Sequence, residues 1–189
     1  MKALNRLFPL FLAAGALCVT ACNNSGNGSA ASDSTAAANT ASDSSKMMAG
    51  SPEQDFINFA VPANTKELIW LQAGIDKSSS GELKKHAKMM KTDHEKLDAT
   101  VKNYLSGHTA ISAPSVDTTN TVNINNKTGN DWNKAWADKM VDDHEALLNK
   151  LKTAQKDIKD TALMAIVTNT IPVVESHLAM AKSLKDKLK

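Results

Sequence analysis

The chain has very little cysteine, and what it has lies near its beginning. Of 189 residues only Cys18 and Cys22 carry a thiol, and no cysteine follows them. Disulfides and thiolate zinc sites both need several cysteines. Residues 23–189 can therefore form neither, and a metal ion bound there would need histidine and carboxylate ligands.

The chain also lacks an excess of charge of either sign. It has 22 basic and 20 acidic residues. Because Lys2 and Arg6 lie in a segment that we expect to be cleaved, the remaining chain is formally neutral, which argues against nucleic acid as a partner. No glycine-rich phosphate loop, nucleophile with an adjacent base, or pair of acid and base carboxylates stands out. The sequence thus favours a binding protein over an enzyme.

A long hydrophobic run is missing as well. The apolar stretch near the N-terminus covers about residues 7–21, follows a short basic head, and is shorter than the roughly 20 residues of a membrane span. It ends in Val-Thr-Ala-Cys, which resembles a bacterial lipobox with Cys22 as the lipid acceptor. We therefore predict a lipoprotein signal peptide over residues 1–21 and membrane attachment through lipid on Cys22. Asn23 in place of an aspartate favours the outer membrane, with the protein facing the periplasm or the cell surface.

Two further segments follow the signal peptide. Residues 22–50 begin with Cys22 and continue almost entirely in Asn, Ser, Gly, Ala, Asp and Thr. This composition offers too little apolar surface to offset the entropy of ordering, so we expect a flexible tether. Residues 51–189 are long enough for one domain with a core of its own.

Helix-start signals and apolar periodicity predict four helices in that domain. They cover about residues 52–77, 80–105, 131–157 and 160–188. The fold class is therefore all-α, a four-helix bundle of the ferritin-like kind with a long connection between the second and third helices. The connection, residues 106–130, is long enough either to stay at one end or to cross the bundle, and its length does not decide between them.

One sequence pattern occurs twice. Residues 87–97 and 137–147 both read A-x-x-M-x-x-D-H-E-x-L, which places His94 and His144 on the apolar stripes of their helices. By the same spacing the fourth helix contributes His177 to the core, and the first contributes Glu67. All four positions lie within about one helical turn of their helix midpoints, so we expect them at one depth.

Two interpretations of this His/Glu group stay open. Neutral imidazoles with one carboxylate suit a single transition-metal ion such as Fe, Zn, Cu or Mn, or a small ligand. Alternatively, the group is a buried hydrogen-bond network that fixes the packing of the helices. Pro62 adds a local alternative for the carboxylate: the helix could restart at Asn64, and Glu67 would then only close a capping box.

The same residues carry a resemblance to a known family. A glutamate in the first helix is followed by Met-Met-x-x-Asp-His at 89–94, Met-Val-x-x-His at 140–144 and Ile-Pro-Val-Val-Glu-Ser-His-Leu at 171–178. This order resembles domain of unknown function 4142, a family of exported bacterial proteins often described as outer membrane proteins, over about residues 53–186. The resemblance implies a ferritin-like bundle but brings no activity with it.

The sequence departs from the di-iron proteins that share that fold. Their helices carry Glu-x-x-His, whereas Lys91, Val141 and Val174 stand three residues before the histidines. Too few carboxylates remain to bridge two irons, although a site for one ion is left. We therefore expect a membrane-tethered module that binds a metal ion or small ligand, with a role in envelope stress or metal handling. The alternative is a non-catalytic structural or protein-interaction bundle.

Overall fold

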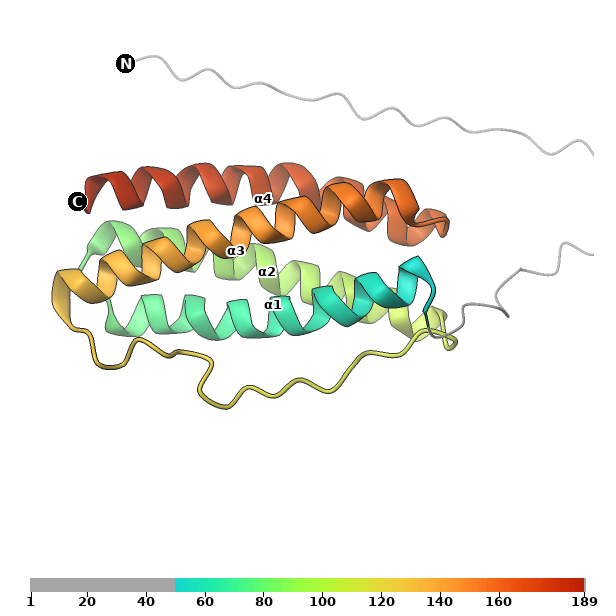
Figure 1. Cartoon of the computed structure of the whole chain (residues 1–189), viewed down its shortest axis with the longest axis horizontal. Helices are drawn as coiled ribbons and strands as arrows, with labels where there is room; N and C mark the ends of the chain where they lie inside the picture. Colours follow the sequence, from blue (N-terminus) through green and yellow to red (C-terminus); the bar gives the residue numbers. More distant parts are fainter. Residues whose placement is uncertain (1–49, 189) are drawn as a thin grey trace, which may run out of the picture. The chain divides into compact units, whose positions relative to one another are not determined.

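In the computed structural model, residues 50–188 are described, and they form four long helices packed side by side (Figure 1). The helices are α1 (Pro52–Lys77), α2 (Gly81–Gly107), α3 (Gly129–Asp157) and α4 (Thr161–Lys187). No strand occurs between residues 50 and 188. The predicted all-α four-helix bundle is thus confirmed. The predicted signal peptide, Cys22 and tether lie outside the described residues.

Side-chain caps explain where three of the helices begin. The hydroxyl of Ser51 accepts a hydrogen bond from the backbone N–H of Gln54 (3.1 Å), just before Pro52 starts α1. Ser80 caps α2 in the same way, and Asp160 caps α4. Each cap satisfies one of the backbone donors that a helix leaves unpaired in its first turn. These serines and this aspartate set the helix starts close to the predicted bounds.

The long connection between α2 and α3 crosses the whole bundle. At its beginning, the Gln54 side chain exchanges hydrogen bonds with the backbone of Ser112, beside the start of α1. Near its end, Lys77 at the last turn of α1 donates to Asn125 (2.7 Å). Figure 1 shows the connection running along the outside of the bundle from one end to the other. The structure therefore decides the topology in favour of the ferritin-like crossing.

The two prolines inside helices do not interrupt them. α1 continues through Pro62 and α4 continues through Pro172. Asn64 consequently does not restart a helix, and the capping-box interpretation of Glu67 is wrong. Each proline removes one backbone hydrogen bond, but packing against the neighbouring helices keeps both segments helical.

The buried core consists of two clusters of apolar side chains with a layer of histidines between them. The tryptophan half contains Trp70, Leu83, Met90, Trp132, Trp136, Met140 and Leu184, among others. The cavity half contains Phe56, Ile57, Val101, Leu151, Leu163 and Val167, among others. On α2, for example, Met90 belongs to the first cluster and Val101 to the second, and His94 lies between them.

α4 differs from the other described helices in composition. By length and apolarity it alone, within residues 50–188, could cross a membrane. It lies in the bundle, however, where Val174 and His177 are buried. These properties alone do not assign it to a membrane.

Candidate metal centre

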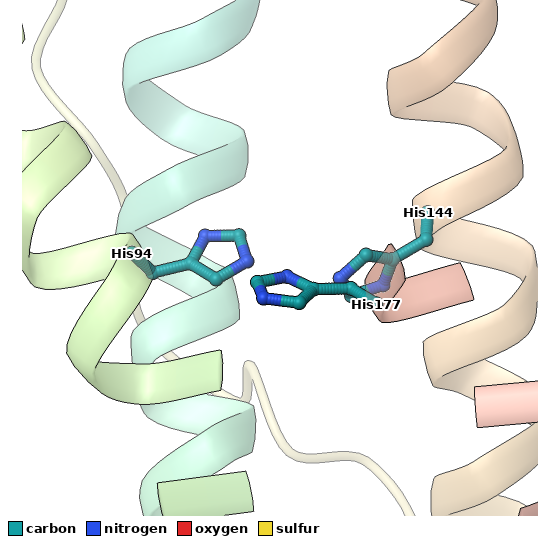
Figure 2. A group of neighbouring side chains, drawn as sticks. All are labelled: His94, His144 and His177. Carbon is teal, nitrogen blue, oxygen red and sulfur yellow. The ribbon is translucent and has the colours of Figure 1, made fainter. Parts of the chain in front are cut away.

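Three histidines from three helices meet in the middle of the bundle. His94 on α2, His144 on α3 and His177 on α4 are each at most 3% exposed. Their ring centroids are 5.5 to 5.8 Å apart, and one nitrogen of each ring lies within 4.8 Å of one nitrogen of each other ring. Figure 2 shows the rings facing one another. Residues from three helices, distant from one another in the sequence, thus form one compact group.

Each ring is held from outside by an acceptor on one of its two nitrogens. Nδ1 of His94 lies 2.8 Å from Oδ1 of Asn64, whose amide nitrogen donates to the His94 carbonyl (3.2 Å). Nδ1 of His144 donates to the carbonyl of Met140 (2.8 Å), and Nε2 of His177 donates to the carboxylate of Asp93 (3.2 Å). Because these oxygens only accept, the hydrogen of each neutral imidazole lies on the outer nitrogen.

The other nitrogen of each ring carries a lone pair and has no hydrogen-bond partner among residues 50–188. These atoms are Nε2 of His94, Nε2 of His144 and Nδ1 of His177, and all three are buried. A buried polar atom without a partner costs about 1 to 3 kcal/mol. Three such acceptors in one place, with no donor among them, make an arrangement that a cation satisfies directly. Outer hydrogen bonds that fix the tautomer are also typical of metal-binding histidines.

Burial keeps the three imidazoles neutral. Desolvation, together with smaller contributions from the neighbouring histidines, lowers the pKa of His94 to about 3 and that of His144 to about 4. The pKa of His177 is also lowered by burial, although its hydrogen bond to Asp93 opposes the shift. At neutral pH all three therefore have the protonation state that a metal ion requires.

The spacing of the rings is close to that of a coordination site. Zinc lies about 2.0 to 2.1 Å from imidazole nitrogens, so two nitrogens on one tetrahedral ion are roughly 3.4 Å apart. The nitrogens lie within 4.8 Å of one another, an upper bound that exceeds that value by about 1.4 Å. Small side-chain rotations would close the difference. Three protein ligands also leave one coordination position free.

Glu67 is not part of this group, although it lies nearby. It is buried, and Oε1 of its carboxyl group has no partner. Burial, together with the charge of Asp143, raises its pKa to about 8. Within residues 50–188 the group of potential metal ligands comprises the three histidines without Glu67. The structure therefore brings together three of the four residues predicted for the site, with Glu67 beside them on the wall of a cavity shared with His94 and His144.

Two hollows reach the histidines from different faces of the bundle. A cavity of about 370 Å³ is lined by residues of all four helices and includes His94 and His144. A groove of about 340 Å³ between α2 and α4 includes His94 and His177. A ligand can therefore approach the cluster without unfolding of the bundle.

Two of the side chains that orient the rings have partners that the sequence did not identify. Asn64 lies on a different helix from the ring that it contacts, and only its position one turn from Glu67 hints at this role. Asp93 precedes His94 but binds His177 instead. Its counterpart in the repeat, Asp143, pairs with Lys139. The two copies of the pattern therefore differ in what their aspartates do.

The remaining two histidines lie elsewhere. Nδ1 of His108 contacts the carbonyl of Tyr104 (2.7 Å), and its ring stacks on that of Tyr104 at the end of α2. His86 is near the start of α2 and is not in the group of potential ligands. Both positions are suitable controls for experiments on the cluster.

Comparison with known proteins adds a family but no activity. The family model described as Domain of unknown function (DUF4142) matches residues 36–184, which include all four helices up to the last turn of α4. No curated protein and no solved structure matches the chain.

Proposed function

The chain belongs to the family described as domain of unknown function 4142, and from this premise we propose that it is a cell-envelope protein that binds one transition-metal ion through His94, His144 and His177. The observation that carries the proposal is the set of three buried, unpartnered lone pairs within one compact group. Their outer nitrogens are already hydrogen-bonded, so the rings are oriented before any ion arrives.

The alternative, a buried hydrogen-bond network, receives less support from the same atoms. In such a network the rings would donate and accept among themselves. Instead their hydrogens point outward to Asn64, Met140 and Asp93, and no donor within the described residues reaches the inner nitrogens. An arrangement that leaves three acceptors unsatisfied is poor as a structural network but suitable as a ligand set.

The ligand types narrow the choice of ion. Neutral imidazoles suit Zn²⁺, Cu²⁺ and Fe²⁺, while Mn²⁺ is favoured by harder oxygen ligands. The three histidines would supply no charge to offset the ion. Asp93, hydrogen-bonded to His177, is the anionic side chain closest in contact with the ligand set. We therefore expect zinc or copper to bind more tightly than manganese.

A melting experiment tests the proposal. An ion that binds only the folded state at one hundred times its dissociation constant stabilises that state by about 2.7 kcal/mol. The purified, untagged full chain should show a higher melting temperature with Zn²⁺ or Cu²⁺ after dialysis against a chelator. His144→Ala should remove this rise, whereas His108→Ala should retain it. If no ion raises the melting temperature, or if both variants lose the rise equally, the metal proposal fails.

The repeat offers a second test with a matched control. Loss of an outer hydrogen bond to a metal-binding histidine weakens metal affinity roughly 10-fold to 100-fold. Asp93→Asn should therefore reduce zinc affinity by that factor in a competition titration. Asp143→Asn, at the equivalent position of the other copy, should change it by less than about threefold because Asp143 pairs with Lys139. Equal effects would mean that the Asp93 contact does not orient a ligand.

The cellular location is proposed on the sequence alone. The lipobox-like ending of the apolar run predicts lipid on Cys22, which would attach the protein to a membrane, with the outer membrane favoured. In that position a metal site would serve metal handling or a response to envelope stress. Labelling with a radioactive fatty acid should mark the wild-type protein but not Cys22→Ser. Equal labelling of both would exclude lipid attachment at this cysteine.

A further inference from the structure

The larger cavity is divided into an apolar end and a polar end. Toward the beginning of α1 its walls carry Phe56, Ala60, Val101, Leu147 and Leu151. Toward the middle of the bundle they carry Glu67, His94 and His144. The apolar residues of all three helices lie at the same end of the cavity. They precede Glu67 on α1 but follow His94 on α2 and His144 on α3, because α1 runs in the opposite direction to α2 and α3. The seven residues from His144 to Leu151 give the apolar part a length of about 10 Å.

The polar end holds three atoms that lack partners. Oε1 of Glu67 and Nε2 of both His94 and His144 are buried, and none of them has a hydrogen bond to the part of the chain that the structure describes. The nearest charged pair does not supply one, since Asp143 is already bound to Lys139. A metal ion would coordinate the two histidine nitrogens, but the glutamate oxygen would still lack a partner. One more polar group beside the ion could therefore form a hydrogen bond with Glu67 at this end of the cavity.

The charge of the ion indicates what that group is. A divalent ion held by three neutral imidazoles has only Asp93, behind His177, to offset its charge, and burying the remaining charge is expensive. An anionic oxygen ligand at the free position would offset it. Apart from Asp98 and Thr170, the adjoining walls are lined by phenyl and aliphatic side chains, which favour a hydrocarbon. One molecule satisfies both ends if it has an anionic head and an apolar chain.

We propose that this cavity binds an unbranched aliphatic carboxylate, with its head between Glu67 and an ion on the histidines and its chain along Val101 and Leu151 toward Phe56. The inference rests on the proposed metal site and extends it, because it names the ligand at the free coordination position. Residues 119–121 of the crossing connection also line the cavity.

A chain-length series provides the first test. Hexanoate, octanoate and decanoate are titrated calorimetrically into the full chain loaded with Zn²⁺. The affinity should rise roughly fourfold for each methylene that enters the cavity. Decanol, which lacks the carboxylate, should bind at least tenfold more weakly than decanoate. The chelator-treated chain should also bind decanoate at least tenfold more weakly than the zinc-loaded chain. Affinities independent of chain length or of zinc overturn the inference.

Two matched variants locate the ligand. Ala60→Trp places an indole in the apolar end of the cavity and should abolish decanoate binding while leaving zinc affinity unchanged. Ala165→Trp makes the same change in the groove between α2 and α4 and should leave both affinities intact. If the circular dichroism of Ala60→Trp shows loss of helix, Leu147→Phe is the smaller substitution and should weaken decanoate at least tenfold. Equal effects of the cavity and groove variants overturn the assignment.

The failure of this inference differs from that of the metal proposal. A chain that binds zinc with the expected dependence on His144 but takes up no alkanoate overturns only the carboxylate site. A chain that binds no metal overturns both. The melting experiment and the alkanoate titration therefore report on the two proposals separately.

Discussion

The tryptophan half and the cavity half of the core differ in how completely they are filled. In the first, Trp136 is fully buried, its Nε1 donates to the carbonyl of Trp70 (2.9 Å), and its indole occupies the space where a Cβ on Gly74 would lie, at 2.9 Å. In the second, residues 59–65 of α1 are only half-buried, next to a cavity of about 370 Å³. The histidine layer lies at the boundary between these two environments.

This difference separates two requirements that a binding site must meet. Closely packed side chains hold the ligating rings in fixed orientations, since interiors of crystal-like density resist rearrangement. A cavity provides room for what is bound. In this bundle one half of the core meets the first requirement and the other half meets the second. The experiments below change one half, the other half or the layer between them.

Acid should have the largest effect on the free energy of unfolding because it protonates the histidine layer between the two halves. The unfolded chain binds protons on its histidines below about pH 6.5, whereas folded His94 and His144 resist protonation down to pKa values of about 3 and 4. The unfolded state therefore binds more protons in this window, and the free energy of unfolding falls by several kcal/mol as the pH drops from about 6.5 to about 4. Denaturant titrations of the metal-free full chain would measure the loss. A constant stability across this range would contradict the burial of neutral imidazoles.

Glu67 should make the stability of the fold depend on pH in the opposite direction to the histidines. Its pKa is about 8 in the folded state against 4.5 for an ordinary glutamate, so the folded chain binds more protons between those values. The free energy of unfolding contributed by this residue falls as the pH rises from about 4.5 to 8. Stability should therefore pass through a maximum near neutral pH. Glu67→Gln should remove the decline above about pH 6.5 and should make the rise in stability between about pH 4.5 and 6.5 steeper, because the two contributions oppose each other there.

Truncating one leucine in each half should show directly how the packing of the two halves differs. Leu184 in the tryptophan half and Leu151 in the cavity half are equally buried, each 1% exposed. Leu184→Ala leaves a void among closely packed neighbours and should cost about 4 kcal/mol, near the upper end for such changes. Leu151 already faces the cavity, so Leu151→Ala should cost about 2 kcal/mol. Equal costs in a denaturant titration would show that the cavity half is as closely packed as the other.

Enlarging a side chain should change the stability of the fold least, and the change should have opposite signs in the two halves. Gly74→Ala brings a methyl group against the buried Trp136 indole, and the strain should outweigh the better helix propensity of alanine by about 1 kcal/mol. Ala63→Val adds apolar volume at the wall of the cavity and should stabilise the fold by about 0.5 kcal/mol. Melting temperatures of the two variants measure this contrast. A stabilising Gly74→Ala would mean that the indole can move aside.

The sequence predicted the elements better than the relations between them. Capping residues and a spacing of three and four residues are local, so the helix bounds and the inward direction of His94, His144 and His177 followed from the chain itself. The path of the long connection did not, because it depends on contacts such as that between Gln54 and Ser112, fifty-eight positions apart.

The details of the site were beyond the sequence for a similar reason. The bond between Asp93 and His177 depends on how α2 and α4 are rotated against each other, which no pattern within one helix specifies. The shared depth placed Glu67 with the histidines, but a shared depth does not fix lateral distance, and Glu67 lies beside the cluster instead. The lipid on Cys22 stays a prediction.

The crossing connection has a consequence for the lifetime of the folded protein. It joins two helical hairpins, α1 with α2 and α3 with α4, each closed by a short turn and each packed mainly against itself. Such local contacts form early in folding, whereas docking of the hairpins across the long connection is the late, non-local step. His94 belongs to one hairpin, and His144 and His177 belong to the other. An ion on all three would therefore join the hairpins only after docking, so it would slow unfolding and leave the rate of folding almost unchanged.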